Sequence, residues 1–222
     1  MKKVSVEVWS DFVCPWCWIA KRRFDKAIAS LLGKVDVSVT FKAYRLAKGA
    51  EPLEYRTALS QKFPSREAVE RFMAIVGQNG VQEGLIYNFE TMRFGDTTLA
   101  HALVKSIDSQ ALKLALTERI YKAATTDGCD IFDRDVLVSL AKEVGATDVA
   151  KDFINPTIIS EIANDEVSAN SIANGVPLFL FNGNAYVSGA RDVAVFEKAL
   201  LDTAVDSPEA IATSCSIDGC SI

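Results

Sequence analysis

Two cysteines separated by two residues are the side chains of this sequence best suited to chemistry. They belong to the motif CPWC at residues 14–17, which follows an apolar strand pattern at residues 4–9 and precedes a helical pattern that starts near Trp18. A pair at such a strand-to-helix junction is typical of a redox-active dithiol. A cysteine just before a helix faces unpaired backbone N–H groups and the positive end of the helix dipole, and both favour its thiolate. We therefore expect Cys14 to be a nucleophile.

The second cysteine of the motif completes the expected chemistry. Cys17 lies about one helical turn after Cys14, so it can attack the mixed disulfide that Cys14 forms with a substrate. Pro15 suits the first turn of a helix, where a missing N–H group costs nothing. Trp16 carries neither a charge nor an ionisable proton. We expect it to favour the thiolate less than a histidine would, which predicts a less oxidising protein.

The composition argues against several classes of protein. The chain has 222 residues, of which 49% are hydrophobic and 24% are charged, as in a globular protein with one large domain or a domain with a sizeable insertion. A net charge of −5 and the lack of a long basic run argue against nucleic acid and anionic membranes as partners. No apolar run approaches a membrane span, and the first residues alternate like a strand rather than a signal peptide. We predict a cytoplasmic protein.

The hydrophobic pattern predicts an α/β fold that is interrupted by a long helical segment. Strand patterns at residues 4–9 and 35–41 enclose a helix at residues 18–32, and this β-α-β unit is expected to pair in parallel. Residues 51–174 show helical patterns with no strand signal of comparable strength. Strands at 177–181 and 185–188 and a helix at 192–203 follow, with Val195, Phe196, Ala199 and Leu200 expected to face the core.

These patterns divide the chain into three predicted parts. Residues 1–50 and 175–205 form one domain of order β-α-β … β-β-α, and residues 51–174 form an α-helical insertion. Residues 206–222 form a polar tail that carries Cys215 and Cys220.

Several motifs together resemble those of a known family. They are SDFVCPWC at residues 10–17, Ala100-His101 in the helical segment, GVPLF at residues 175–179, Ser188-Gly189-Ala190 and the spacing Cys215-x4-Cys220. The chain resembles the DsbA-like thioredoxin superfamily over nearly its whole length, most closely its FrnE-like cytosolic dithiol oxidoreductases. Arg191 stands where the family often has glutamine. The resemblance implies a thioredoxin-like fold with a large helical insertion, and disulfide exchange through Cys14 and Cys17.

The resemblance also implies a cis peptide bond between Val176 and Pro177, opposite the CPWC motif. Such a bond exposes the backbone of the residue before proline, so an extended substrate segment can pair with it. We expect Val176, Pro177 and Trp16 to contact the substrate. The alternative is an ordinary proline at the start of a strand.

Three further side chains are candidates for tuning the site. Asp11 either relays protons to Cys17 or, as we favour, caps a turn. Lys21 lies four residues after Cys17, where it either raises the local positive potential or belongs to a solvated Lys-Arg-Arg face. His101 is the only histidine of the chain, and a structural hydrogen bond is the favoured role, although the resemblance places it near the cleft.

The remaining cysteines have different predicted roles. Cys129 lies between two predicted helices and is expected to be a free thiol. Cys215 and Cys220 resemble the second pair of some FrnE-like proteins, and we interpret them as an auxiliary redox pair that exchanges electrons with the active site. The alternative is a frayed chain end with incidental cysteines.

We therefore interpret the chain as a thiol–disulfide oxidoreductase that needs no metal or organic cofactor. Its substrates are expected to be thiols or disulfides of proteins or small molecules, glutathione among them, and the protein is expected to be a monomer or homodimer. One alternative is a glutathione-dependent transferase or isomerase like the kappa-class enzymes and hydroxychromene carboxylate isomerases, which typically carry serine at the position of Cys14. Another is a zinc-stabilised or chaperone-like module in which Cys215 and Cys220 complete a thiolate shell.

Overall fold

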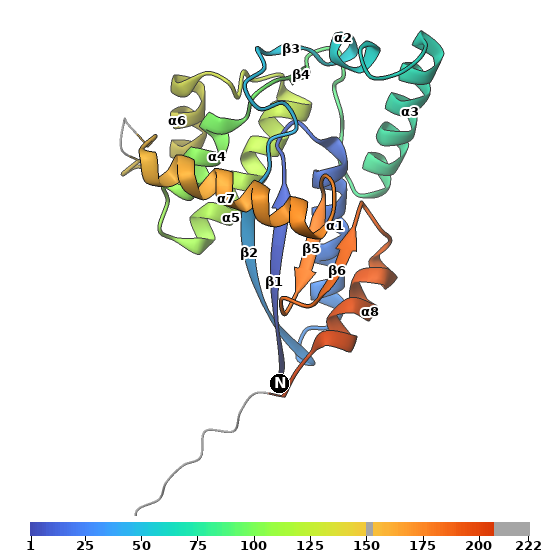
Figure 1. Cartoon of the computed structure of the whole chain (residues 1–222), viewed down its shortest axis with the longest axis vertical. Coiled ribbons are helices and arrows are strands. Elements are labelled where there is room, and N and C mark those ends of the chain that lie inside the picture. The colour runs from blue at the N-terminus through green and yellow to red at the C-terminus, as the bar shows by residue number, and fades with distance from the viewer. Residues whose placement is uncertain (150–152, 207–222) are drawn as a thin grey trace, which may run out of the picture.

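The computed structural model describes residues 1–149 and 153–206 and is built around a four-stranded mixed sheet (Figure 1). The strand order is β2-β1-β5-β6. β1 pairs in parallel with β2, whereas β5 pairs antiparallel with both β1 and β6. The strands are β1 (Lys2–Ser10), β2 (Val35–Ala43), β5 (Leu178–Phe181) and β6 (Ala185–Ser188).

Helix α1 (Pro15–Ser30) connects β1 to β2 and completes the predicted β-α-β unit. It begins three residues earlier than the pattern near Trp18 indicates, because the fixed backbone angle of Pro15 suits the first helical position. The apolar stripe of α1 reveals the body of the helix and not its first turn.

Opposite faces of the sheet carry different helices, because alternate residues of β1 point in opposite directions. Val8 lies in a buried cluster with Phe24 of α1 and Phe196 of α8 (Val193–Thr203). Its neighbour Trp9 lies in another cluster with Ala169 of α7 (Pro156–Ile172), which crosses the sheet in Figure 1. The prediction for Val195 is wrong, since this side chain is 42% exposed. Helix α8 buries the narrow face that carries Phe196 and Leu200.

The long segment between β2 and β5 is mainly helical, as predicted. Its helices are α2 (Tyr55–Ser60), α3 (Arg66–Gln82), α4 (Thr98–Lys105), α5 (Gln110–Lys122), the π-helical turn η1 (Ala123–Asp127), α6 (Arg134–Glu143) and α7. Side chains of Ser65, Asp133 and Asn155 accept hydrogen bonds at the starts of α3, α6 and α7. These caps explain why the helices begin where they do.

Two short strands interrupt this segment, although none was predicted. β3 (Leu53–Glu54) pairs antiparallel with β4 (Arg93–Phe94), and the N–H group of Tyr55 donates to the carbonyl of Met92 at 3.0 Å. A two-residue strand is shorter than the stretch over which alternation can be recognised in a sequence. The pairing holds the chain before α2 against the chain before α4.

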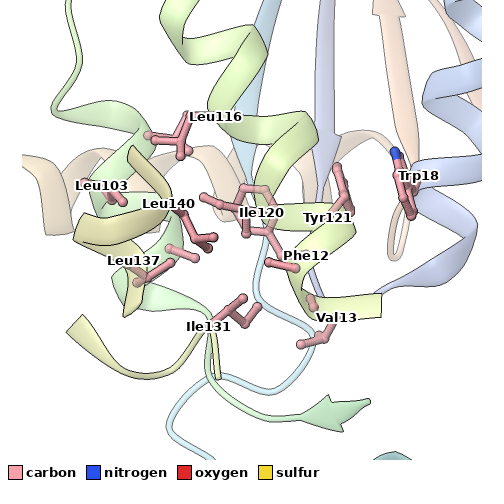
Figure 2. Close-up of a cluster of buried hydrophobic side chains, with 14 of the residues drawn as sticks. Phe12, Val13, Trp18, Leu103, Leu116, Ile120, Tyr121, Ile131, Leu137 and Leu140 are labelled. Atoms are coloured by element: carbon pink, nitrogen blue, oxygen red, sulfur yellow. The ribbon is translucent and has the colours of Figure 1, made fainter. Parts of the chain in front are cut away.

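The loop that leads into α1 shares a hydrophobic core with the inserted helices (Figure 2). Phe12, Val13 and Trp18 pack in one cluster with Leu103 of α4, Leu116 and Ile120 of α5, and Leu137 and Leu140 of α6. The insertion therefore covers the end of β1 where the CPWC motif begins.

Across the described ranges, the helices lack the combination of length and apolar character needed to cross a membrane.

Candidate functional site

Cys14 occupies the N-cap position of α1, directly ahead of Pro15, as the spacing predicts. Its backbone is extended, with φ −98° and ψ 105°, and its N–H group donates to the carbonyl of Asp11 at 3.1 Å. The carbonyl of Cys14 accepts from the N–H group of Cys17 at 3.0 Å. The side chain of Cys14 forms no capping hydrogen bond, so the expected direct contact between its sulfur and the first-turn N–H groups is not made. The helix dipole remains as the local source of positive potential.

Both cysteines of the motif are free thiols, and both are largely shielded from solvent. Cys14 is 6% exposed and Cys17 is 2% exposed. Burial raises the pKa of Cys17 well above its ordinary value, and a hydrogen bond with Cys14 and the charge on Cys14 raise it further. A backbone hydrogen bond from Asp11 acts in the opposite direction, while the charge of the Asp11 carboxylate adds to the rise of this pKa. Cys17 therefore holds its proton and is placed to donate a hydrogen bond to the sulfur of Cys14.

The carboxylate of Asp11 is fully buried and joins three parts of the chain. One oxygen accepts from the N–H group of Val13 at 3.4 Å and from the hydroxyl of Thr97 at 2.8 Å. The other oxygen accepts from the N–H group of Leu46 at 2.7 Å. The contact with Val13 agrees with the favoured turn-capping role, and the other two fix the motif loop against the chain after β2 and the start of α4.

His101 lies beside this carboxylate on α4 and is 5% exposed. Its Nε2 atom is 3.1 Å from the carbonyl oxygen of Tyr44 and 3.9 Å from Oδ1 of Asp11. A carbonyl only accepts, so Nε2 carries the proton. The ring also packs on Phe12 with a centroid distance of 4.8 Å. These contacts agree with the structural hydrogen bond that we favoured for this residue.

The Lys-Arg-Arg cluster on α1 is not a solvated face, and that alternative is wrong. The Lys21 ammonium lies 2.7 Å from Asp25 and 3.2 Å from Glu118, and its side chain is 11% exposed. The side chain of Arg23 is 7% exposed. Lys21 is therefore held in two ion pairs, and the carboxylates offset its positive charge.

Arg23 is a structural residue of the site that the sequence reasoning missed. Its guanidinium donates to Glu83 and Asn79 at the end of α3 and to the carbonyl of Ala190, each at 2.8 Å. It thereby ties α1 to the insertion and to the turn after β6. The signal was present in the spacing, because Arg23 lies between Ala20 and Ala27 on the buried stripe of α1.

The Val176–Pro177 peptide bond is cis, which confirms the prediction. Gly175 precedes it with φ +98°, a conformation that strongly favours glycine. The carbonyl of Pro177 accepts from the N–H group of Gly189 at 2.8 Å. Val176 itself makes no backbone hydrogen bond within the described residues. Val176 and Trp16 are half-buried and pack against the hydrophobic cluster that contains both motif cysteines.

Tyr87 is a second neighbour of the motif that the sequence did not reveal. Its hydroxyl donates to the carbonyl of Pro15 at 2.8 Å. Its ring lies so close to Gly80 of α3 that a Cβ atom there would be 2.5 Å from it, so glycine is required. Tyr87 and Phe89 also line an open cavity of about 950 Å³ along α3. An open groove therefore lies beside Tyr87, whose hydroxyl contacts the backbone of the CPWC motif.

The other cysteines are not part of this arrangement as far as the structure describes it. Cys129 is a half-buried free thiol in the loop after η1. Cys215 and Cys220 lie outside the described residues. Within residues 1–149 and 153–206, no group of three or more histidine, cysteine or acidic side chains is arranged to hold a metal ion. The zinc alternative depends on the two tail cysteines and stays open.

Residues 5–201 match the model of the DSBA-like thioredoxin domain, so the chain belongs to this family. The observed order β-α-β … β-β-α, with helices inserted between β2 and β5, is the thioredoxin-like fold with a large α-helical insertion that the sequence predicts.

Solved structures share this fold across most of the chain. A probable DsbA oxidoreductase from Streptomyces coelicolor is 29% identical, with a TM-score of 0.84 and 99% of each chain covered. The cytosolic disulfide reductase DsbM from Pseudomonas aeruginosa, also solved with glutathione, is 18% identical with a TM-score of 0.58, over 89% of this chain and 94% of that one. A 2-hydroxychromene-2-carboxylate isomerase is 15% identical with a TM-score of 0.66, over 89% and 95% of the two chains.

Proposed function

We propose that this protein is a thiol–disulfide oxidoreductase in which Cys14 is the nucleophile and Cys17 is the resolving thiol. The observation that carries the proposal is the position of Cys14 at the N-cap of α1, with the buried, protonated Cys17 one turn behind it and hydrogen-bonded to it. Family membership supports the same chemistry.

The exchange follows from this geometry. The Cys14 thiolate attacks a substrate disulfide, one substrate sulfur leaves, and a mixed disulfide forms. Cys17 then loses its proton and attacks the sulfur of Cys14, which releases the second substrate thiol and leaves a Cys14–Cys17 disulfide. The substrate docks as an extended segment against Val176, whose backbone groups are not used by the described protein, with Pro177 and Trp16 at its side. The reverse sequence oxidises a dithiol.

We extend the proposal to the substrate class and to the location of the protein. Substrates are thiols and disulfides of proteins or small molecules, and glutathione is the small thiol that we favour, because a structural neighbour was solved with it. The protein acts in the cytoplasm as one of the FrnE-like members and uses no metal or organic cofactor. Trp16 adds no positive charge beside Cys14, so we expect a less oxidising protein than one that carries histidine at this position.

Two matched substitutions test the roles of the cysteines. Cys14→Ser is expected to abolish reaction with a disulfide substrate, whereas Cys17→Ser is expected to react once and to stop at a mixed disulfide that mass spectrometry detects. Cys129→Ser removes a thiol outside the motif and serves as the control. A Cys17→Ser variant that turns over at the wild-type rate would contradict the assignment.

A glutathione-dependent isomerase is the second candidate, because the isomerase neighbour has the same fold. That activity needs bound glutathione and no resolving thiol, so it would survive in the Cys17→Ser variant. Assaying the two variants for isomerisation with reduced glutathione, and for disulfide exchange without it, separates the candidates.

We propose further that Cys215 and Cys220 act as an auxiliary redox pair. The chain leaves the described structure beside Lys3, which pairs with Val205 through backbone hydrogen bonds. Lys3 and Ser10 are separated by roughly 23 Å of strand, and the ten residues that lead to Cys215 extend at most about 36 Å. The reach therefore exceeds the length of the strand, so the chain's own motif and the motif of a second copy are both accessible targets. A Cys215→Ser, Cys220→Ser double variant with unchanged turnover would remove this proposal.

A further inference from the structure

Arg23 lies where α1, the end of α3 and the turn after β6 meet (Figure 1). Its side chain is 7% exposed. Three different nitrogen atoms of the guanidinium donate hydrogen bonds, each at 2.8 Å: Nε to the carboxylate of Glu83, Nη2 to the side chain of Asn79 and Nη1 to the carbonyl of Ala190. Acceptors from two separate parts of the chain therefore fix this guanidinium.

The α3 end of this contact is a firm anchor. The side chain of Glu83 is 7% exposed, and it also accepts from the ammonium of Lys26 at 2.7 Å. Burial alone would raise the pKa of Glu83, but the hydrogen bonds from Lys26 and Arg23 outweigh it and hold this pKa below its ordinary value. The carboxylate keeps its charge, so Arg23 has a fixed partner that does not depend on the turn after β6.

The turn after β6 holds the segment that contains the cis peptide bond. The ladder between β1 and β5 ends at Leu178, so Val176 and Pro177 lie beyond it. The carbonyl of Pro177 accepts from the N–H group of Gly189 at 2.8 Å, and the next residue is Ala190, whose carbonyl the guanidinium binds. Two hydrogen bonds thus connect the cis segment to α1.

This connection bears on substrate docking. In the proposed exchange, an extended substrate segment pairs with the backbone of Val176 while Cys14 attacks its sulfur. Cys14 stands at the N-cap of α1, so the guanidinium joins the helix of the nucleophile to the turn that supports the docking backbone. Backbone hydrogen bonds weaken steeply when their geometry departs from the optimum, so docking depends on the relative position of these two parts.

Other charged groups of this turn do not make the same connection. Asp192 lies 3.7 Å from Nη1 of Arg23, but its side chain is 88% exposed, and an ion pair of this kind contributes little. Nε of Arg191 donates to the carbonyl of Ser188 at 3.0 Å, so this arginine shapes the turn without joining it to α1.

We propose that Arg23 is a positioning residue, which holds the turn after β6, and through it the Val176–Pro177 segment, where substrate docking requires it relative to α1. This inference rests on the proposed function. Lysine at this position would keep a positive charge opposite Glu83, but its single nitrogen cannot replace three nitrogen atoms that serve three acceptors. Arg23→Lys is therefore expected to fold and to lose the hydrogen bond to the carbonyl of Ala190, because the carboxylate is the stronger acceptor.

A trapped single turnover measures docking separately from the reactivity of Cys14. The probe is a peptide dimer, in which one disulfide joins two identical synthetic peptides. In the Cys17→Ser background the Cys14 thiolate attacks one sulfur of the probe, the other peptide leaves as a thiolate that takes up a proton, and the reaction stops at the mixed disulfide. Rates at rising probe concentration give a half-saturating concentration and a limiting rate. Alkylation of Cys14 by iodoacetamide, which offers no extended segment for docking, reports the thiol alone.

The matched control acts on the same guanidinium from the other side. Asn79→Ala removes an acceptor that Arg23 uses on α3 and leaves the bond to Ala190 in place. Arg23→Gln, in which Lys26 still pairs with Glu83, repeats the test with a shorter, neutral side chain. Thermal unfolding of each variant reports its stability.

Arg23→Lys and Arg23→Gln are expected to raise the half-saturating concentration about three- to tenfold, which corresponds to the loss of about one hydrogen bond. The limiting rate and the alkylation rate are expected to stay nearly unchanged. Asn79→Ala is expected to lower the unfolding temperature and to keep the half-saturating concentration of the parent. A peptide dimer that is N-methylated on both sides of its cysteine cannot pair its backbone with Val176, so it should react equally with the parent and with Arg23→Lys.

An unchanged half-saturating concentration in both Arg23 variants would overturn the positioning role and leave the proposed function intact. An equal rise in Asn79→Ala, or a difference that persists with the N-methylated peptide, would assign Arg23 a role in stability alone and would also overturn it. A Cys17→Ser chain that forms no mixed disulfide with the peptide would overturn the proposed function, and this inference with it.

Discussion

β1 contacts two regions that pack in different ways: the apolar cluster on one face of the sheet and the inserted helices at the end of the strand. On one side Val4, Val6 and Val8 meet α1, β5 and α8 in a cluster of apolar side chains. At the end of β1 the motif loop meets the inserted helices, and there buried polar groups gather around the apolar ones, among them Asp11, Thr97, His101, Thr117 and Thr125. In the described chain, β5, β6 and α8 contribute none of the buried polar side chains. The sheet side stabilises the fold, and the insertion side supplies the environment for chemistry.

The inserted helices do more than cover the CPWC motif. A lone thioredoxin-like unit would leave the end of β1 and the start of α1 exposed to water. The inserted helices bury Cys17 and bring three side chains to the motif: Thr97 from the N-cap of α4, His101 from α4 itself and Tyr121 from α5. The burial that raises the pKa of Cys17 therefore comes from parts far apart in the sequence, whereas the charges that raise this pKa are those of its near neighbours Cys14 and Asp11.

The largest effect is expected from the apolar side. Phe179 is fully buried between Phe24 and Phe196, with centroid distances of 5.1 Å and 4.7 Å. Phe179→Ala is expected to lower the free energy of unfolding by about 3–5 kcal/mol through lost burial and a cavity. Chemical denaturation measures the loss. The alkylation rate of Cys14 in the folded variant should stay at the wild-type value, and a large change in that rate would contradict the separation of the two sides.

A smaller loss of stability, joined to a change in chemistry, is expected at Asp11. Three groups donate hydrogen bonds to the Asp11 carboxylate. In Asp11→Asn at least one of them faces an amide N–H group instead of an acceptor, which lowers the free energy of unfolding by about 1–3 kcal/mol. It also removes a charge that raises the pKa of Cys17, so the resolution rate should reach its midpoint at lower pH. Stopped-flow resolution rates against pH measure the shift. Slower resolution at every pH would instead favour the proton relay over the turn cap.

The burial of Cys17 predicts a dependence of stability on alkaline pH. Its folded-state pKa lies above the ordinary value of 9.0, so the unfolded state loses this proton first as the pH rises. The contribution is fully present below the unfolded pKa and falls by at most about 1.4 kcal/mol per pH unit above it, until the folded pKa is reached. Unfolding curves between about pH 8 and pH 10 measure the slope, and the comparison with a variant that lacks Cys17 removes the contribution that the buried tyrosines make near pH 10. Cys17→Ala should flatten it, and an equal slope in that variant would exclude Cys17 as its source.

The smallest effect is expected at Lys21. Its ammonium is bound to Asp25 and Glu118, and ion pairs of this partly exposed kind contribute about 0–1 kcal/mol. Lys21→Met should leave both the stability and the alkylation rate of Cys14 nearly unchanged. A marked slowing of alkylation would restore the role in raising the local potential that the sequence suggested.

Local patterns were sufficient for much of the fold. The spacing of the cysteines and Pro15 placed Cys14 directly before a helix, because a helix start depends on a few neighbouring residues. The alternation of apolar and polar residues that predicted β1 and β2 has the same local origin. The two-residue strands β3 and β4 were missed, and Val195 was placed on the wrong face, because each depends on what lies opposite in space.

The sequence by itself determined which residues can do chemistry here: a dithiol before a helix, and a proline before a strand in the place where a thioredoxin-like fold sets it opposite that dithiol. Only the tertiary structure decided how those residues behave. It paired Lys21 with carboxylates, buried Arg23 as a tie between α1, α3 and the turn after β6, and buried Cys17 in a core shared with the inserted helices. Burial depends on what packs nearby in space, so the raised pKa of Cys17 depends on inserted helices that lie far away along the chain.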